Sequence, residues 1–121
     1  MNKLLSGRRI LVVEDEMMVL MLIEDMLEEL GCRFVTVAAT VERALTLIDG
    51  NTFDAALLDM NLNGANSQDV AAGLATRRVP FAFSTGYSTL KMAPIYRDRP
   101  VLSKPFAITE LAEICKLLLP R

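Results

Sequence analysis

Residues 54–61 read DAALLDMN, an apolar run that ends in a charged residue. The run from Ala55 to Leu58 shows no polar alternation, which is typical of a central strand covered on both faces. Asp59 follows it, and residues 61–67, NLNGANS, are almost all turn formers. A carboxylate at the end of a buried strand needs a partner. The stretch therefore predicts a strand over residues 55–59 whose last side chain belongs to a functional site.

Strand and helix signals alternate along the rest of the chain. Apolar runs predict strands, and apolar residues at helical spacing predict the helices between them. The predicted strands cover residues 10–13, 34–38, 55–59, 80–84 and 101–103, and the predicted helices cover residues 17–30, 41–48, 68–76, 88–93 and 108–118. The helix over 88–93 is expected to be weak, because Pro94 ends it.

Side-chain patterns add detail to three of these helices. In the first, we expect the core-facing stripe to consist of Val19, Leu22, Ile23, Met26, Leu27 and Leu30. Met17 and Met21 lie opposite this stripe and are expected to be exposed. Thr40 is the expected N-cap of the second helix, and Asn66 or Ser67 of the third.

Strands that alternate with helices pair in parallel, and right-handed crossovers place the helices on both faces of the sheet. Five such units predict a doubly wound, flavodoxin-like α/β domain with strand order 2-1-3-4-5. The site of such a domain lies at the carboxyl edge, where strands 1 and 3 diverge. Asp15 and Asp59 come at the ends of these two strands.

Composition describes an ordinary globular domain and excludes several classes of function. The chain has 121 residues, 52% of them hydrophobic, with a net charge of −2, so a nucleic-acid partner is not expected. No apolar stretch is long enough to span a membrane and the first residues are too few for a signal peptide, so we expect a cytoplasmic protein. The absence of histidine excludes His-based catalysis and His-ligated zinc. Cys32 and Cys115 are expected to be buried free thiols.

Acidic and basic side chains at the predicted edge suit phosphoryl chemistry. Glu14, Asp15 and Asp59 would lie within a few ångströms, which is unfavourable unless a cation neutralises them. An all-oxygen pocket suits Mg²⁺, and a carboxylate beside Mg²⁺ can attack phosphorus. The new phosphoryl oxygens need donors, and Thr85 and Lys104 follow the two neighbouring strands. Singly, Asp15 is also explained as a helix cap and Lys104 as a surface lysine.

Four short motifs, each at the end of a predicted strand, resemble the response-regulator receiver domains of two-component signalling. They are VVEDE (12–16), LLDMN (57–61), STG (84–86) and SKPF (103–106), and the resemblance covers essentially the whole chain. It implies that Asp59 is the phosphoacceptor, Thr85 the switch hydroxyl and Lys104 the phosphate-contacting lysine.

The resemblance also implies a Mg²⁺ site and a backbone feature. Asp15 and Asp59 would bind the metal directly, Glu14 through a water molecule, and Asn61 through its backbone carbonyl. A cis peptide bond is implied between Lys104 and Pro105.

The chain departs from the common receiver pattern at its output switch. Many members carry a Tyr or Phe, which rotates upon phosphorylation, where this chain has Val101. FSTGY (83–87) resembles a subgroup with Phe-Ala-Thr-Gly at this place, and the loop after Asp59 lacks the usual proline. We therefore expect Thr85 to act by tightening the weak helix over 88–93.

The sequence predicts a stand-alone receiver domain over residues 1–121 with no output domain. It would accept a phosphoryl group on Asp59, with Mg²⁺, from a sensor histidine kinase or a histidine phosphotransfer protein. The result would be a switched protein–protein interaction or a drain of phosphate, and the protein would be a monomer or a weak phosphorylation-dependent dimer. Turnover of an external substrate is not expected.

Three alternatives have different sequence requirements. A degenerate receiver would act as an adaptor without phosphorylation, although the acceptor, metal and lysine positions are intact. A Mg²⁺-dependent aspartyl phosphohydrolase is disfavoured, because Asn61 stands where such enzymes carry a second Asp. A nucleotide- or flavin-binding module would want a glycine-rich loop after strand 1, and residues 14–18 read EDEMM.

Overall fold

The fold is an α/β sandwich built on one five-stranded parallel sheet. The computed structural model describes residues 4–62, 65–86 and 99–119. The sheet has the order β2-β1-β3-β6-β7, which confirms the predicted doubly wound, flavodoxin-like topology. Its strands are β1 (Arg9–Val13), β2 (Phe34–Ala38), β3 (Ala55–Asp59), β6 (Phe81–Thr85) and β7 (Val101–Ser103).

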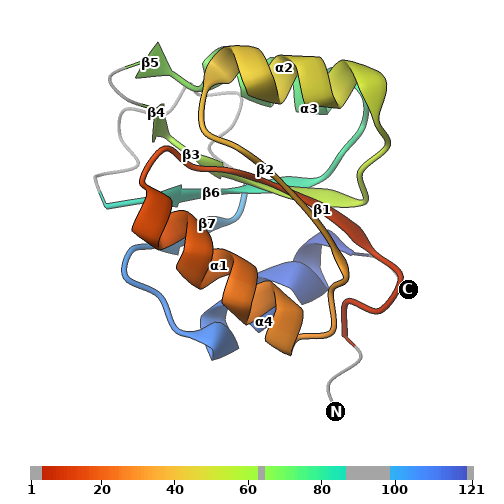
Figure 1. The fold of residues 1–121 in the computed structure, drawn as a ribbon, viewed down its shortest axis with the longest axis vertical. Helices are drawn as coiled ribbons and strands as arrows, with labels where there is room; N and C mark the ends of the chain where they lie inside the picture. Colours follow the sequence, from red (N-terminus) through yellow and green to blue (C-terminus); the bar gives the residue numbers. More distant parts are fainter. Residues whose placement is uncertain (1–3, 63–64, 87–98, 120–121) are drawn as a thin grey trace.

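Helices cover both faces of the sheet, as Figure 1 shows. The helices α1 (Met17–Glu29) and α4 (Ile108–Leu118) lie on one face, and α2 (Val41–Gly50) and α3 (Gln68–Thr76) lie on the other. The predicted fourth helix, over residues 88–93, lies outside the described residues. Among the residues that are described, no helix combines the length and hydropathy needed to cross a bilayer.

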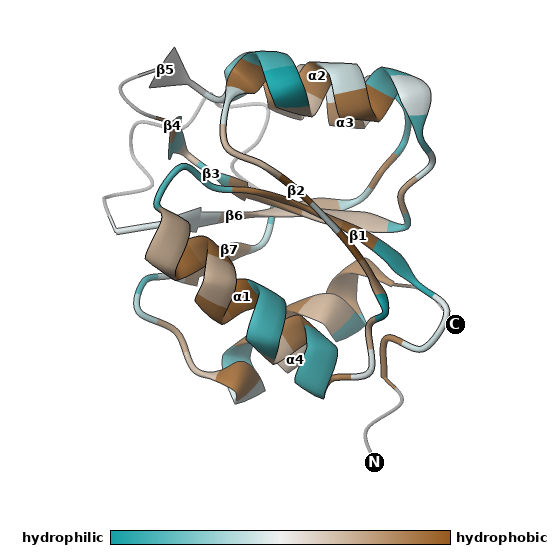
Figure 2. Ribbon diagram, viewed as in Figure 1, coloured by the Kyte–Doolittle hydropathy of each residue, from teal (hydrophilic) through white to brown (hydrophobic). Residues whose placement is uncertain are grey.

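Strand β3 is the centre of the core, and every residue in it is buried. Ala56 and Leu58 pack in the core under α2 and α3, whereas Ala55 and Leu57 pack in the core under α1 and α4. The strand contacts apolar side chains on both faces, which is why its sequence does not alternate. Figure 2 shows the same concentration of hydrophobic residues in the sheet. Asp59 continues the parity of Ala55 and Leu57, so its side chain leaves on the α1 side.

The predicted core-facing stripe of α1 was wrong in part. The buried residues of the helix are Leu20, Ile23 and Leu27, and Val19 and Met26 flank them. Leu22, which was expected in the core, is 52% exposed. Residues 17–23 read MMVLMLI, so the first two turns are apolar all round and periodicity cannot identify the side that faces the sheet. Met17 and Met21 are exposed, as predicted.

Hydrogen bonds at the helix starts separate two similar predictions. The hydroxyl of Thr40 accepts a hydrogen bond from the Arg43 N–H at 3.1 Å, which confirms it as the N-cap of α2. Ser67 stands at the N-cap position of α3 but caps nothing with its side chain. Its buried hydroxyl instead donates to the Met60 carbonyl at 3.0 Å.

The remaining differences are local. The segment predicted as a turn contains two short antiparallel strands, β4 (Asn61–Leu62) and β5 (Ala65–Asn66). Strand β6 begins at Phe81 and not at Pro80, because proline has no N–H to donate to the sheet. The Lys104–Pro105 peptide bond is cis, as the resemblance implied. Cys32 and Cys115 are buried free thiols.

The Ser67 hydrogen bond predicts a stability difference between two hydroxyl deletions. Ser67→Ala should lower the free energy of unfolding by about 1–2 kcal/mol, because a partly buried carbonyl loses its donor. Thr46→Ala is the matched control, since the Thr46 hydroxyl also donates to a carbonyl, that of Glu42 at 3.0 Å, but at an exposed position. Urea denaturation measures both. Equal effects would show that the Ser67 bond contributes nothing specific.

Candidate functional site

Three carboxylates meet at the carboxyl edge of the sheet. Strands β1 and β3 are parallel neighbours with Val13 opposite Leu58, so Glu14 and Asp59 follow at adjacent positions. One oxygen each of Glu14, Asp15 and Asp59 lies within 4.8 Å of the other two. The structure thus brings together the acidic residues that the sequence analysis singled out. Asp15 does not cap α1, because Glu16 occupies the N-cap position.

Glu14 is the most firmly held of the three carboxylates. It is 1% exposed, and both of its oxygens accept hydrogen bonds. Its Oε1 accepts from the Lys104 ammonium at 2.7 Å, and its Oε2 accepts from the Glu16 N–H at 3.1 Å. These two hydrogen bonds, one to each oxygen, hold the buried Glu14 carboxylate in one orientation.

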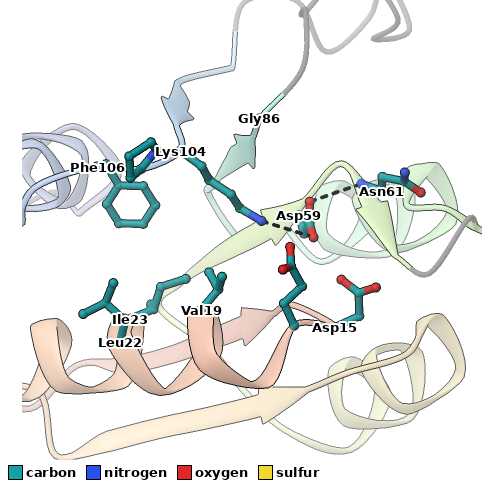
Figure 3. A pocket seen from close by; sticks show the side chains of 11 residues that line it. Asp15, Val19, Leu22, Ile23, Asp59, Asn61, Gly86, Lys104 and Phe106 are labelled. Carbon is teal, nitrogen blue, oxygen red and sulfur yellow. Dashed lines mark hydrogen bonds and ion pairs between the residues drawn. The ribbon is translucent and has the colours of Figure 1, made fainter.

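Asp59 has longer contacts than Glu14 and faces a cavity. Its Oδ1 accepts a hydrogen bond from the Asn61 N–H at 3.3 Å, and its Oδ2 lies 3.4 Å from the Lys104 ammonium. Figure 3 shows both interactions as dashed lines in a close view of the cavity. The cavity has a volume of about 660 Å³ and is bounded on its apolar side by Val19, Leu22, Ile23 and Phe106. Asp59 is therefore buried, yet next to space that a ligand can enter.

Lys104 crosses the sheet edge to reach the carboxylates. Its backbone N–H donates to the Thr85 carbonyl at 2.9 Å, which places the residue at the end of β7. Its side chain contacts Glu14 more closely than Asp59, a pairing that sequence reasoning missed. The sequence indicated that a buried carboxylate needs a cation, but it did not indicate which cation would pair with Glu14.

The charges of the cluster act on one another. Burial, and then the nearby charge of Glu14, raise the pKa of Asp59 from 3.8 to about 7, although Lys104 opposes this. Burial alone would lower the pKa of Lys104, but the hydrogen bond to Glu14 and the charge of Asp59 outweigh it and the net shift is upward. Lys104 is therefore a permanent cation, and the cluster as a whole has excess negative charge.

The other two expected site residues occupy different places. Asn61 lines the cavity beside Asp59. Thr85 is 3% exposed at the end of β6, where its Cα pairs with Ser103 of β7. Gly86, the next residue, lines the cavity, and Thr85 itself does not. The cluster in this structure therefore consists of Glu14, Asp15, Asp59 and Lys104, with Thr85 buried at its border.

A family model for the response regulator receiver domain matches residues 10–116. The chain belongs to this family. Solved structures of high similarity include SdrG from Sphingomonas melonis, with 42% sequence identity, a TM-score of 0.82, and coverage of 95% of this chain and 97% of that one. TrrA from Thermotoga maritima, solved with Mg²⁺ and BeF, has 28% identity and a TM-score of 0.81, with coverage of 93% and 99%.

Two further relatives add a metal and a size comparison. The receiver domain of the sensor histidine kinase PA1611 from Pseudomonas aeruginosa was solved with magnesium in its active-site cleft, and it has 29% identity, a TM-score of 0.80, and coverage of 93% and 98%. The transcriptional regulatory protein PdtaR of Mycobacterium tuberculosis is 28% identical in an alignment 118 residues long, which covers 94% of this chain and 58% of that protein. The chain thus spans little more than half the length of this curated relative.

The raised pKa of Asp59 predicts that replacing its carboxylate with a neutral amide stabilises the fold, and that this gain depends on pH. Between pH 3.8 and about 7 the folded state holds the Asp59 proton more tightly than the unfolded state, so wild-type stability falls as the pH rises through this range. In EDTA, Asp59→Asn should therefore raise the free energy of unfolding by about 1–3 kcal/mol at pH 8. The gain should vanish near pH 4.

Denaturant unfolding at both pH values tests this expectation. Asp49→Asn is the control, because the Asp49 carboxylate is exposed and paired with Arg77. Its effect should be small and should not follow the same pH dependence. A destabilised Asp59→Asn at pH 8 would contradict the charge crowding described above.

Proposed function

We propose that this chain accepts a phosphoryl group on Asp59 from a sensor histidine kinase or a histidine phosphotransfer protein. The observation that carries the proposal is the position of Asp59, which is buried, lines a cavity and lies 3.4 Å from an ammonium group. Membership of the receiver family supports the choice of donor. The expectations of a stand-alone domain over 1–121 and of the Phe-Ala-Thr-Gly subgroup remain predictions.

The donor set fits a Mg²⁺ ion. Three carboxylates within 4.8 Å of one another form an all-oxygen site with surplus negative charge, which is what a small divalent cation neutralises. We assign direct contacts to Asp15, Asp59 and the Asn61 carbonyl, and a water-mediated contact to Glu14. When bound, Mg²⁺ offsets the repulsion between the carboxylates and the oxygens of an incoming phosphoryl group. The two relatives solved with Mg²⁺ support this assignment.

Each side chain of the site has a separate role in the proposed phosphoryl transfer. One Oδ of Asp59 forms the new bond to phosphorus while the P–N bond of the donor phosphohistidine breaks. The Lys104 ammonium is already 2.7 Å from Glu14, so it can pair with a phosphoryl oxygen while Glu14 keeps it in place. The Thr85 hydroxyl, which does not line the cavity in this structure, would move toward the phosphoryl group, donate to another of its oxygens and so report phosphorylation to the rest of the fold.

The exposed start of α1 provides a surface for the phosphodonor. Met17, Met18, Met21 and Leu22 are all more than half exposed, and the last of these lines the cavity of Asp59. Figure 2 shows the hydrophobic colour of these first turns, which gives way to hydrophilic residues further along α1. Flexible methionine side chains adapt to the surface of a partner. We assign this surface to docking of a helical donor.

Labelling with a small phosphodonor tests the acceptor directly. Incubation with acetyl phosphate should add one phosphoryl group to the wild type when Mg²⁺ is present and none in EDTA, as measured by intact-protein mass. Asp59→Asn should gain none, and Asp49→Asn, the exposed control, should be labelled normally. Labelling of the Asp59→Asn protein would show that Asp59 is not the phosphoacceptor. An adaptor that works without phosphorylation would show no labelling even in the wild type.

The docking surface predicts a variant that separates two donors. Met21→Lys should slow transfer from the cognate phosphorylated donor protein about tenfold or more, because a charge would enter an apolar contact. Labelling by acetyl phosphate should be unchanged, since Met21 is 56% exposed and no part of the carboxylate cluster. Leu117→Lys on α4, at a position 73% exposed, is the matched control. A parallel loss with both donors would contradict the docking role.

A further inference from the structure

A second cavity lies at the opposite edge of the sheet from Asp59. It has a volume of about 660 Å³, and its lining includes Arg8, Asp54, Pro80 and Arg99. Arg8, Asp54 and Pro80 directly precede β1, β3 and β6, and Arg99 comes two residues before β7, so all four lie at the amino ends of the parallel strands. Figure 1 shows these strands running side by side, and it follows that the two cavities are at opposite ends of the sheet.

The charge of this second cavity is the reverse of that at the acidic cluster. Three arginines line it, Arg8, Arg78 and Arg99, against one carboxylate, Asp54. One oxygen of that carboxylate already accepts a hydrogen bond from the Arg9 N–H at 2.7 Å. The chain as a whole has a net charge of −2, so the excess of positive charge is local to this edge of the sheet.

Two of the arginines form no ion pair with another described residue. Among the residues that the structure describes, ion pairs involve Arg77, Lys104 and Lys116, and neither Arg78 nor Arg99. The Arg99 guanidinium carbon lies 4.4 Å from the centre of the Phe81 ring, which orients its planar group without neutralising it. The half-buried Arg99 is therefore positioned in advance of binding.

The backbone at Arg78 strengthens the case for a role of its side chain. The Val79 N–H donates to the Leu74 carbonyl at 2.9 Å and the Arg78 N–H donates to the Ala75 carbonyl at 3.0 Å, which is the Schellman ending of a helix. Glycine is usual at the position of Arg78, whose φ is +59°. An arginine in this conformation makes the fold less stable than a glycine would. Such positions are often kept for function.

We propose that this cavity binds a small organic phosphate. Guanidinium groups hold phosphate oxygens in paired hydrogen bonds, which Arg78 and Arg99 supply. The buried side chains of Phe53, Val79 and Leu118 form an apolar wall for the organic part of the ligand. The volume is in the range of small-molecule sites. This site is independent of the phosphoacceptor site, where carboxylates repel such anions.

A titration followed by ¹H–¹⁵N NMR tests the proposal with adenosine monophosphate as the probe, in EDTA so that the acidic cluster binds no metal–phosphate complex. The amides of Asp54, Val79 and Phe81 should shift, and those of Asp59 and Asn61 should not. Inorganic phosphate should shift the same cavity amides but bind more weakly, and adenosine should cause no shift. Unchanged cavity amides with adenosine monophosphate would overturn the proposal. Equal affinity for inorganic phosphate would show that the organic part of the ligand contributes nothing to binding, and would overturn that part of the proposal.

Two arginine variants separate a built site from general charge. Arg78→Gly should weaken binding of adenosine monophosphate about tenfold, the equivalent of one lost phosphate contact. Its urea midpoint should stay level or rise, because glycine suits the backbone conformation, so the loss of binding cannot be due to unfolding. Arg77→Gln removes the neighbouring charge, which is paired with Asp49 outside the cavity, and should leave affinity within about twofold. Equal losses in both variants would show non-specific attraction and overturn the site.

Discussion

The ion pair between Glu14 and Lys104 is the constraint on which the functional edge of this fold depends. It joins the end of β1 to the end of β7 across the two strands between them, at a distance of 2.7 Å. Glu14 is 1% exposed, so loss of Lys104 would leave it as an uncompensated buried charge, at a typical cost of about 3–5 kcal/mol. The pair thus holds the edge in register and keeps an ammonium next to Asp59.

The same pair explains how Asp59 can be buried and still suit the proposed reaction. Lys104 is shared between two carboxylates and is closer to Glu14, so Asp59 is only partly compensated. An under-compensated carboxylate beside a cavity is unfavourable for stability but favourable for attack on an electrophile, once a cation offsets the local charge. The instability of the acidic cluster and its proposed chemistry therefore have one electrostatic origin.

Parallel pairing gives the two ends of the sheet different chemistry. All five strands of the sheet point the same way, so residues that follow the strands gather at one edge and residues that precede them gather at the other. In this chain the charged residues at the first edge are mainly carboxylates, and those at the second edge are mainly arginines. Helix α1 begins at the acidic edge and leaves apolar side chains exposed there, which places an apolar surface next to the proposed acceptor.

The sequence determined the order and type of the described elements other than β4 and β5, and it placed β3 at Ala55–Asp59. These features follow from short-range patterns, namely an apolar run, helical spacing and a capping Thr40, together with the general rules of parallel sheets. The same rules brought Asp15 and Asp59 to one edge before any distance was known. The four strand-end motifs then identified the family, because their order along the chain matches their positions around the edge.

Tertiary structure alone decided the partners of the side chains. The buried side of α1 is set by contact with the sheet, and so Leu20 is in the core where Leu22 was expected. The choice of Glu14 as the closest partner of Lys104, 90 residues away, depends on the relative positions of two non-adjacent strands. The Ser67 hydroxyl donates to Met60 and does not cap its own helix, and Arg78 occupies a glycine conformation, because packing overrides local preference. Local patterns fix which residues are neighbours along an element, whereas contacts between elements depend on distances that exist only in the folded chain.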